Sequence, residues 1–165
     1  TVACLTVVMV LLLLAGPAAP QIPVDKLIVP GQRVGKWTLE MTIIDLVRMN
    51  GPATIDSSGG LDHITPVPRR YRWGTLYAST RDGQRVEFFL IFDDATFKTE
   101  KNIGGGSNRT SVQSAYGTPT AETKVSSVRT RMIYDVLGFA ALIESDQVVG
   151  VNVFRPGTGK SIWSF

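Results

Sequence analysis

A basic and aromatic cluster, Arg69-Arg70-Tyr71-Arg72-Trp73, is the densest group of side chains in this sequence that could bind a ligand. Because alternate side chains of an extended strand point to opposite faces, Arg70 and Arg72 would share one face and the two aromatic residues the other. Adjacent guanidinium groups suit an acidic protein surface, an anionic glycan or a lipid headgroup. The alternative is a strand whose aromatic side chains lie in the core while its arginines meet solvent and discourage edge pairing.

A second candidate surface follows from the apolar run of residues 86–92, Val-Glu-Phe-Phe-Leu-Ile-Phe. If the even-numbered side chains pack against helices, Phe89 and Ile91 point to the opposite face, which an antiparallel sheet often leaves in contact with water. Exposed apolar side chains in a cluster indicate a partner surface. The alternative is that the loop 53–68 or the N-terminal leader covers both residues.

Tyr77 completes the predicted partner surface. It lies between Leu76 and Ala78, so it is out of phase with the expected buried residues of its own strand and falls on the face predicted for Phe89. Aromatic and arginine side chains anchor many protein interfaces. The candidate partner-binding residues are therefore Tyr77, Phe89, Ile91, Arg70 and Arg72.

Catalytic and metal-binding signals in the sequence are weak. His63 is the only histidine, and it lies beside Asp62 and close to Ser57 and Ser58 in a glycine-rich loop. A Ser-His-Asp site needs a rigid scaffold to bring its three members together, whereas here they crowd one loop, which favours solvated loop residues. One histidine, one cysteine and no spaced carboxylates predict no metal site and no cofactor.

The N-terminal segment predicts export. Residues 7–14 form an uninterrupted apolar run, and small residues and prolines follow it up to Pro20. This order is typical of a secretory signal peptide, with cleavage near Ala18 or Ala19 and a periplasmic or extracellular mature protein. The run is shorter than the roughly 20 residues of a spanning helix. An uncleaved anchor remains the alternative, and it would be the chain's only membrane contact.

The composition is that of a globular domain. Of 165 residues, 44% are hydrophobic and 19% are charged, which excludes a wholly disordered chain. The single cysteine excludes a disulfide framework. The net charge of +3 is mild, and an exported protein seldom meets nucleic acid, so no nucleic-acid partner is predicted.

Two stretches of the sequence, residues 34–52 and 103–119, repeat one pattern. Each opens with an aliphatic residue and glycine, and continues through a polar cap into a short amphipathic stretch that closes with glycine and then proline. This pattern predicts a short helix, which Gly51 or Gly117 ends by adopting a left-handed conformation.

The predicted starts of the two helices differ in their caps. In the first, Thr42 can cap the helix and Asp45, three residues later, completes a capping box. In the second, either Asn108 or Ser107 can cap. Strand patterns follow each helix, and Asp82-Gly83 signals a hairpin turn after the first.

These elements predict an α+β fold in which two helix-plus-antiparallel-strand repeats share one sheet, with the helices on one face. The expected division of the chain is a signal peptide or anchor at 1–20, an extended leader at 21–30, the first repeat at 31–102, the second repeat at 103–156 and a tail at 157–165.

With these features, residues 29–154 resemble the tandem repeats of β-lactamase-inhibitor-protein-like domains, and their plan is similar to that of the SmpA/OmlA family of outer-membrane assembly lipoproteins. The resemblance implies an exported bacterial binding protein, without enzymatic activity, that contacts a protein or envelope ligand through its sheet. The lipid-attachment cysteine of the lipoproteins is missing, because Cys4 precedes the apolar run. Alternative functions are a small hydrolase that uses the loop around His63 and an envelope-assembly scaffold held by an uncleaved anchor.

Overall fold

A large antiparallel sheet forms the centre of the molecule in the computed structural model, which describes residues 22–56 and 69–163. Its eight strands follow the order β4-β5-β6-β7-β12-β11-β10-β9. Their bounds are β4 Thr54–Asp56, β5 Arg69–Trp73, β6 Leu76–Thr80, β7 Phe88–Phe92, β9 Ala121–Lys124, β10 Arg129–Tyr134, β11 Phe139–Glu144 and β12 Gln147–Phe154. The α+β class and the antiparallel sheet agree with the sequence-based prediction.

A second, smaller sheet was not predicted. Its order is β3-β2-β1-β8, and β1 pairs with β8 in parallel. The bounds are β1 Leu27–Val29, β2 Arg33–Val34, β3 Trp37–Thr38 and β8 Lys98–Thr99. The expectation of a single sheet is therefore wrong, because the short leader strand pairs with a segment far along the chain instead of extending the large sheet.

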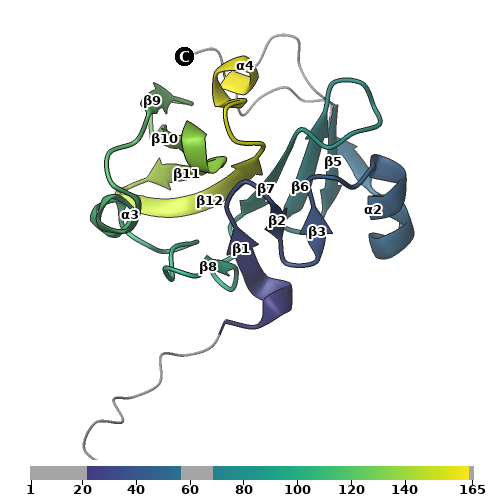
Figure 1. Ribbon diagram of the computed structural model, residues 1–165, viewed down its shortest axis with the longest axis horizontal. Coiled ribbons are helices and arrows are strands. Elements are labelled where there is room, and N and C mark those ends of the chain that lie inside the picture. Colours follow the sequence, from purple (N-terminus) through teal and green to yellow (C-terminus); the bar gives the residue numbers. More distant parts are fainter. Residues whose placement is uncertain (1–21, 57–68, 164–165) are drawn as a thin grey trace, which may run out of the picture.

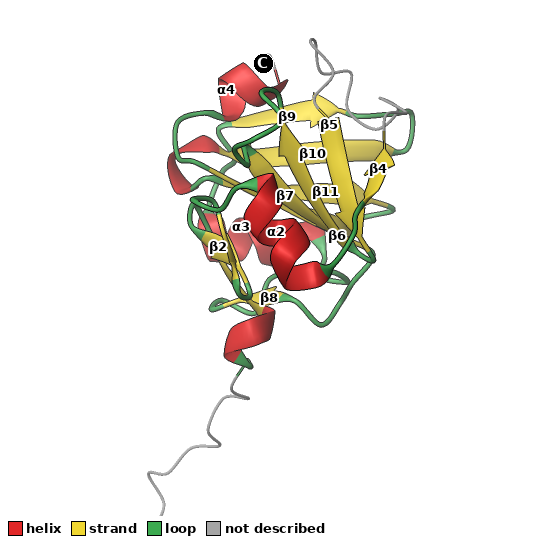
Figure 2. Cartoon of the chain, turned by 90° about the vertical axis from the view of Figure 1, so that its right-hand side faces the viewer, coloured by secondary structure: helices red, strands yellow, loops and turns green. Residues whose placement is uncertain are grey.

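Helices cover both faces of the large sheet. Helices α2 (Ile43–Asn50) and α3 (Arg109–Tyr116) pack with the small sheet on one face, whereas α4 (Gly159–Trp163) packs on the other (Figures 1 and 2). Short 3-10 turns lie at Val24–Lys26 and Asp135–Leu137. The prediction that all helices share one face is therefore wrong for α4, because the second face is also apolar and needs a cover.

The predicted helix boundaries are confirmed. Thr42 Oγ1 accepts a hydrogen bond from the Asp45 N–H at 3.2 Å, and Asp45 Oδ2 accepts one from the Thr42 N–H at 3.0 Å, which completes the capping box. The side chain of Asn108 caps α3. Gly51 and Gly117 end the two helices with φ of +81° and +79°. Local sequence signals therefore place both helices.

Valine at either helix-ending glycine is expected to cost a similar amount of stability. A Cβ at Gly51 or Gly117 would meet nothing within 4 Å, so strain at positive φ is the only direct cost. We expect Gly51→Val and Gly117→Val each to lower the free energy of unfolding by about 1–2 kcal/mol. Urea denaturation measures both losses, and a variant that unfolds like the wild type would contradict the positive φ at that helix end.

The strands are arranged alike on both sides of the central pair β7 and β12. Leu90 and Asn152 face each other across this pair. Two residues before each of them, on the same face, lie Phe88 and Gly150. From Phe88 the paired residues toward the sheet edge are Ser79 and Arg70, and from Gly150 they are Leu142 and Arg131. The two arginines thus occupy matching positions on β5 and β10.

The two faces of the large sheet have different cores. The face toward α2 and α3, called here the α2–α3 face, buries the larger cluster, which includes Ala78, Phe89, Ile91 and Val153. The opposite face, called here the α4 face, buries Phe88, Ile133, Ala140 and Phe154 against Ile162 and Trp163 of α4. The predicted site residues are divided between these two faces.

Candidate functional site

The α4 face gathers three of the five predicted site residues. Arg72 lies opposite Tyr77 in the pairing of β5 and β6, and Arg70 lies opposite Ser79 on the same face. Tyr71 and Trp73 point the other way and pack against the larger core. This strand therefore places aromatic side chains inward and presents arginines on the α4 face.

Arg72 and Tyr77 form the accessible part of this surface. The Arg72 guanidinium carbon lies 5.4 Å from the centre of the Tyr77 ring, and Arg72 Nε donates a hydrogen bond to the Gly74 carbonyl at 2.9 Å. Arg72 is exposed and Tyr77 is half-buried. The hydrogen bond and the ring contact hold the arginine in place, so its remaining donors are oriented before any ligand arrives.

Deeper in the α4 face, polar side chains are buried. Arg70 and Arg131 are 4% and 2% exposed, and Ser79 and Asn152 are 1% and 0% exposed. Within the part of the chain that the structure describes, Ser79 Oγ and both polar atoms of the Asn152 amide have no hydrogen-bond partner. An unsatisfied buried polar group costs about 1–3 kcal/mol, so these groups call for an explanation beyond packing.

Arginine–aromatic contacts recur across the α4 face. The Arg129 guanidinium lies 5.2 Å from the centre of the Phe92 ring, and Arg129 Nε contacts a Glu144 carboxylate oxygen at 2.5 Å. The Arg131 guanidinium lies 4.7 Å from the Trp163 ring. Together with Arg72 over Tyr77, these contacts place positive charge beside aromatic rings at β5 and at β10, in both halves of the α4 face.

Phe89 and Ile91 do not belong to this surface. They are 0% and 2% exposed and lie in the core of the α2–α3 face, so the prediction that they form an exposed partner surface is wrong. Strand β7 begins at Phe88, so side chains alternate between the two faces only from that residue on. Val86 precedes the strand and packs in the same core as Phe89, although an unbroken strand would place them on opposite faces. Counting alternation through Val86 therefore assigned the two faces of β7 the wrong way round.

A carboxylate lies at the edge of α4. Glu87 Oε1 pairs with Arg81 Nη1 at 3.4 Å, and both residues line a cavity of about 180 Å³ with Arg155 and Ser161. Burial raises the pKa of Glu87 against the opposing effect of Arg81. Arg81 and Arg155 also donate hydrogen bonds to the backbone carbonyls of Ser161 and Val86, so this group mainly joins α4 to the sheet.

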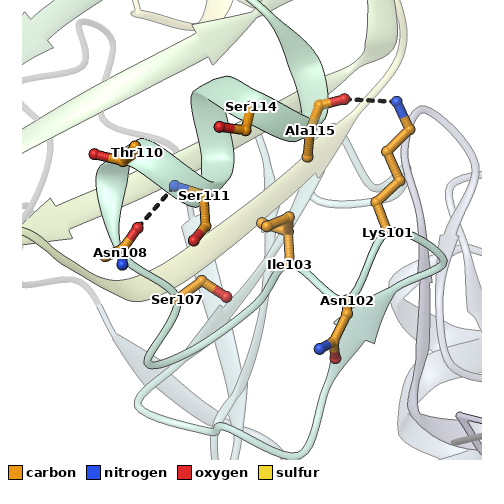
Figure 3. Close-up of a pocket in the computed structure, with 9 residues that line it drawn as sticks. All are labelled: Lys101, Asn102, Ile103, Ser107, Asn108, Thr110, Ser111, Ser114 and Ala115. Carbon is orange, nitrogen blue, oxygen red and sulfur yellow. Dashed lines mark hydrogen bonds between the residues drawn. The ribbon is translucent and has the colours of Figure 1, made fainter. Parts of the chain in front are cut away.

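An open groove of about 620 Å³ runs beside α3 (Figure 3). Its lining is rich in hydroxyl and amide groups, and Lys101 is the only charged side chain among the lining residues. Lys101 Nζ donates to the Ala115 carbonyl at 2.6 Å, and Asn108 Oδ1 accepts from the Ser111 N–H at 2.7 Å. Both contacts are at the ends of α3, so Lys101 and Asn108 serve to cap this helix.

Other predicted features fall outside the described residues. His63 with its glycine-rich loop and the proposed signal segment at 1–20 are among them. In the ranges 22–56 and 69–163, no three side chains of the metal-binding types form a cluster. The same ranges contain no helix of sufficient length and apolar character to cross a membrane.

Comparisons with known proteins give no independent assignment: no protein-family model, curated protein or solved structure matches this chain. The functional argument therefore rests on the geometry of the α4 face. Sequence reasoning identified Arg70, Arg72 and Tyr77 on that face. It missed Ser79, Asn152 and Arg131, for which a period-two pattern around each strand was the only available signal.

Proposed function

We propose that this chain is an exported bacterial binding protein, without enzymatic activity, that recognises an acidic segment of a protein partner through the α4 face. Arg72 and Tyr77 make the first contact in this proposal. Export is inferred from the apolar run and small residues of the N-terminal segment.

The observation that carries the proposal is the exposed contact of Arg72 with the Tyr77 ring. Tyrosine and arginine dominate the binding energy of many protein interfaces, because they bury a large area and offer directed hydrogen bonds. An arginine already held by the Gly74 carbonyl loses little freedom when a carboxylate binds it. Arg72 is an exposed cation on this face, which favours an acidic partner.

A two-repeat architecture is the second part of the proposal, and matched contacts in the two halves support it. Trp73 Nε1 donates to the Gly51 carbonyl at 2.9 Å, and Tyr134 Oη donates to the Gly117 carbonyl at 3.1 Å. Each donor comes from a matching strand, and each acceptor ends a helix of the same length. Such a repeat would place Arg70 and Arg131 at equivalent points of one binding face.

The starts of the two helices add to this support. Thr42 forms an isolated β-bridge with Arg85, and Asn108 forms one with Gln147. Arg85 lies three residues before β7, and Gln147 is the first residue of β12, so each capping residue is bridged to the chain near the start of a central strand. A duplicated unit of this kind resembles the β-lactamase-inhibitor-protein-like repeats, whose fold alone does not fix a partner.

Binding of an acidic peptide tests the proposed function. The probe is a fluorescein-labelled peptide of alternating glutamate and glycine, titrated into the full chain and followed by fluorescence anisotropy. We expect Arg72→Ala and Tyr77→Ala each to weaken binding about tenfold, and rising salt to weaken binding to the wild type. A basic peptide of the same length should not bind.

Arg48→Ala is the matched control, because Arg48 is an exposed arginine on α2, on the opposite face of the sheet. It removes the same charge and should leave the affinity unchanged. Equal weakening by Arg48→Ala and Arg72→Ala would show that net charge, and not the α4 face, attracts the peptide. That result would contradict the proposed function.

A further inference from the structure

The indole of Trp163 lies in a cage on the α4 face. Its ring centre is 4.8 Å from that of Phe154, almost perpendicular to it, and 5.7 Å from that of Phe88. The Arg131 guanidinium lies 4.7 Å from the same ring. Two aromatic rings from adjacent strands and a cation therefore surround one aromatic side chain, which they hold through ring contacts and a cation–π interaction.

The cage and its surroundings offer polar groups that α4 leaves unused. Trp163 Nε1 is buried and has no hydrogen-bond acceptor in the described ranges. Ser79, whose hydroxyl also lacks a partner, lies opposite Phe88, and Asn152 lies two residues before Phe154 on the same face. A segment that permanently covers this face would be expected to form hydrogen bonds with these buried polar groups. Peptide groups of an incoming chain could pair with them.

Besides the cage contacts of α4, Ile162 packs in the same core, and hydrogen bonds tie the helix to the rest of the described chain. The helix has five residues, which is too short to be stable alone. The Gly159 N–H donates to Asp135 Oδ1 at 2.7 Å, and Arg81 Nη2 donates to the Ser161 carbonyl at 2.7 Å in an exposed position. Gly157 precedes the helix with φ of +80° and open space around it. A short terminal helix of this kind costs less free energy to detach than a strand of the large sheet.

We propose that this cage, formed by Phe88, Phe154 and Arg131, is a binding site for an aromatic side chain of a partner peptide, and that α4 is its exchangeable internal occupant. The inference rests on the proposed function, because it assumes that the α4 face meets the partner. It adds the chemistry of the ligand: a peptide segment that presents an aromatic ring to the cage and its main-chain groups to Ser79 and Asn152.

The test removes the internal ring from the full chain with Trp163→Ala. The probe is a fluorescein-labelled peptide with the sequence of residues 156–163. We expect the variant to bind this peptide saturably and at least about tenfold more tightly than the wild-type chain does. The same peptide with alanine in place of its tryptophan should not bind. Equal and weak binding of the probe to both chains overturns the proposal.

Trp73→Ala is the matched control variant. It also removes an indole, but Trp73 is half-buried, packs against the α2–α3 core and donates to the Gly51 carbonyl. This variant should bind the peptide no better than the wild type. A gain as large as that of Trp163→Ala would mean that general loosening, and not an emptied cage, admits the peptide, and it would also overturn the proposal.

Hydrogen exchange of the wild-type chain avoids any loss of folding in the variants. An exchangeable α4 opens without global unfolding, so the Gly159 and Ile162 amides should exchange at least about a hundredfold faster than the paired amides of β12. Exchange of both sets at one rate would show α4 to be a fixed part of the fold. If α4 is fixed but the glutamate peptide still binds through Arg72, only the displacement of α4 is overturned. If α4 opens but the glutamate peptide does not bind, only the proposed function is overturned.

Discussion

The Phe89→Ser variant is expected to lose about 3–5 kcal/mol of unfolding free energy. Phe89 is 0% exposed and lies on the central strand β7, between Ala78 of β6 and Val153 of β12. Serine removes a whole ring from this core and places a hydroxyl group in the cavity that remains. Urea denaturation and a thermal melt measure the loss.

The control for this variant is Ile55→Ser, which makes a similar change on the edge strand β4, where Ile55 is 62% exposed. An exposed substitution of this kind changes stability by about 0.5 kcal/mol or less. If Phe89→Ser melts within a degree or two of Ile55→Ser, the assignment of Phe89 to the core is wrong, and its side chain must point to the α4 face.

Valine at Gly138 is expected to cost about 3 kcal/mol or more, because strain and lost hydrogen bonds combine. Gly138 has φ of +66°, and a Cβ there would overlap the carbonyl oxygen of Phe154 and lie 2.7 Å from the Gly31 Cα. The Gly138 carbonyl accepts hydrogen bonds from the N–H groups of Gly31 and Phe154. Room for the side chain requires these backbones to separate.

Gly106→Val separates the two causes of that loss. Gly106 has φ of +81° but nothing within 4 Å of an added Cβ, so the variant carries the strain without the overlap. It should lose about 1–2 kcal/mol in the same urea titration. Equal losses at Gly138 and Gly106 would show that the close approach of Gly138 to Phe154 is not tightly constrained.

Local signals explain which elements the sequence predicted. Thr42, Asp45 and Gly51 lie within one short segment, and their hydrogen bonds close between neighbours, so their pattern alone defines α2. The same holds for the predicted turn at Asp82, whose carboxylate accepts from the Gln84 and Arg85 N–H groups. These hydrogen bonds lower the Asp82 pKa to about 2.

Long-range packing explains what the sequence did not predict. Strand β7 lies between covers on both faces, so Phe88 through Ile91 are all buried and no alternation marks the faces. Helix α4 has only Ile162 and Trp163 as large apolar residues, which is too few for a periodic signal, and the segment was therefore assigned to a tail. Its position depends on Phe88, which is distant in sequence, as well as on the nearer Phe154.

The candidate site was predictable to the extent that it depends on strand alternation. Alternation placed Arg70 and Arg72 on one face of their strand, and the flanking Leu76 and Ala78 placed Tyr77 on the face of its strand away from the core. The pairing of β5 with β6 brings these two faces together. Alternation does not predict how deeply a side chain is buried. Arg70 is buried and Arg72 is exposed, although both lie on β5 and point to the same face. That difference depends on three-dimensional neighbours and required the structure.

Backbone amide chemical shifts of the full chain, recorded by NMR as the glutamate peptide is added, test most directly the claim that the α4 face binds the partner. We expect the largest shifts at Arg72, Tyr77 and their neighbours on β5 and β6, and unchanged shifts on α2. Ile44 of α2 and Ile55 of β4 are exposed apolar residues outside the α4 face, so they are the alternative contact points. Shifts centred on α2 and β4, with none on β5 and β6, would contradict the account.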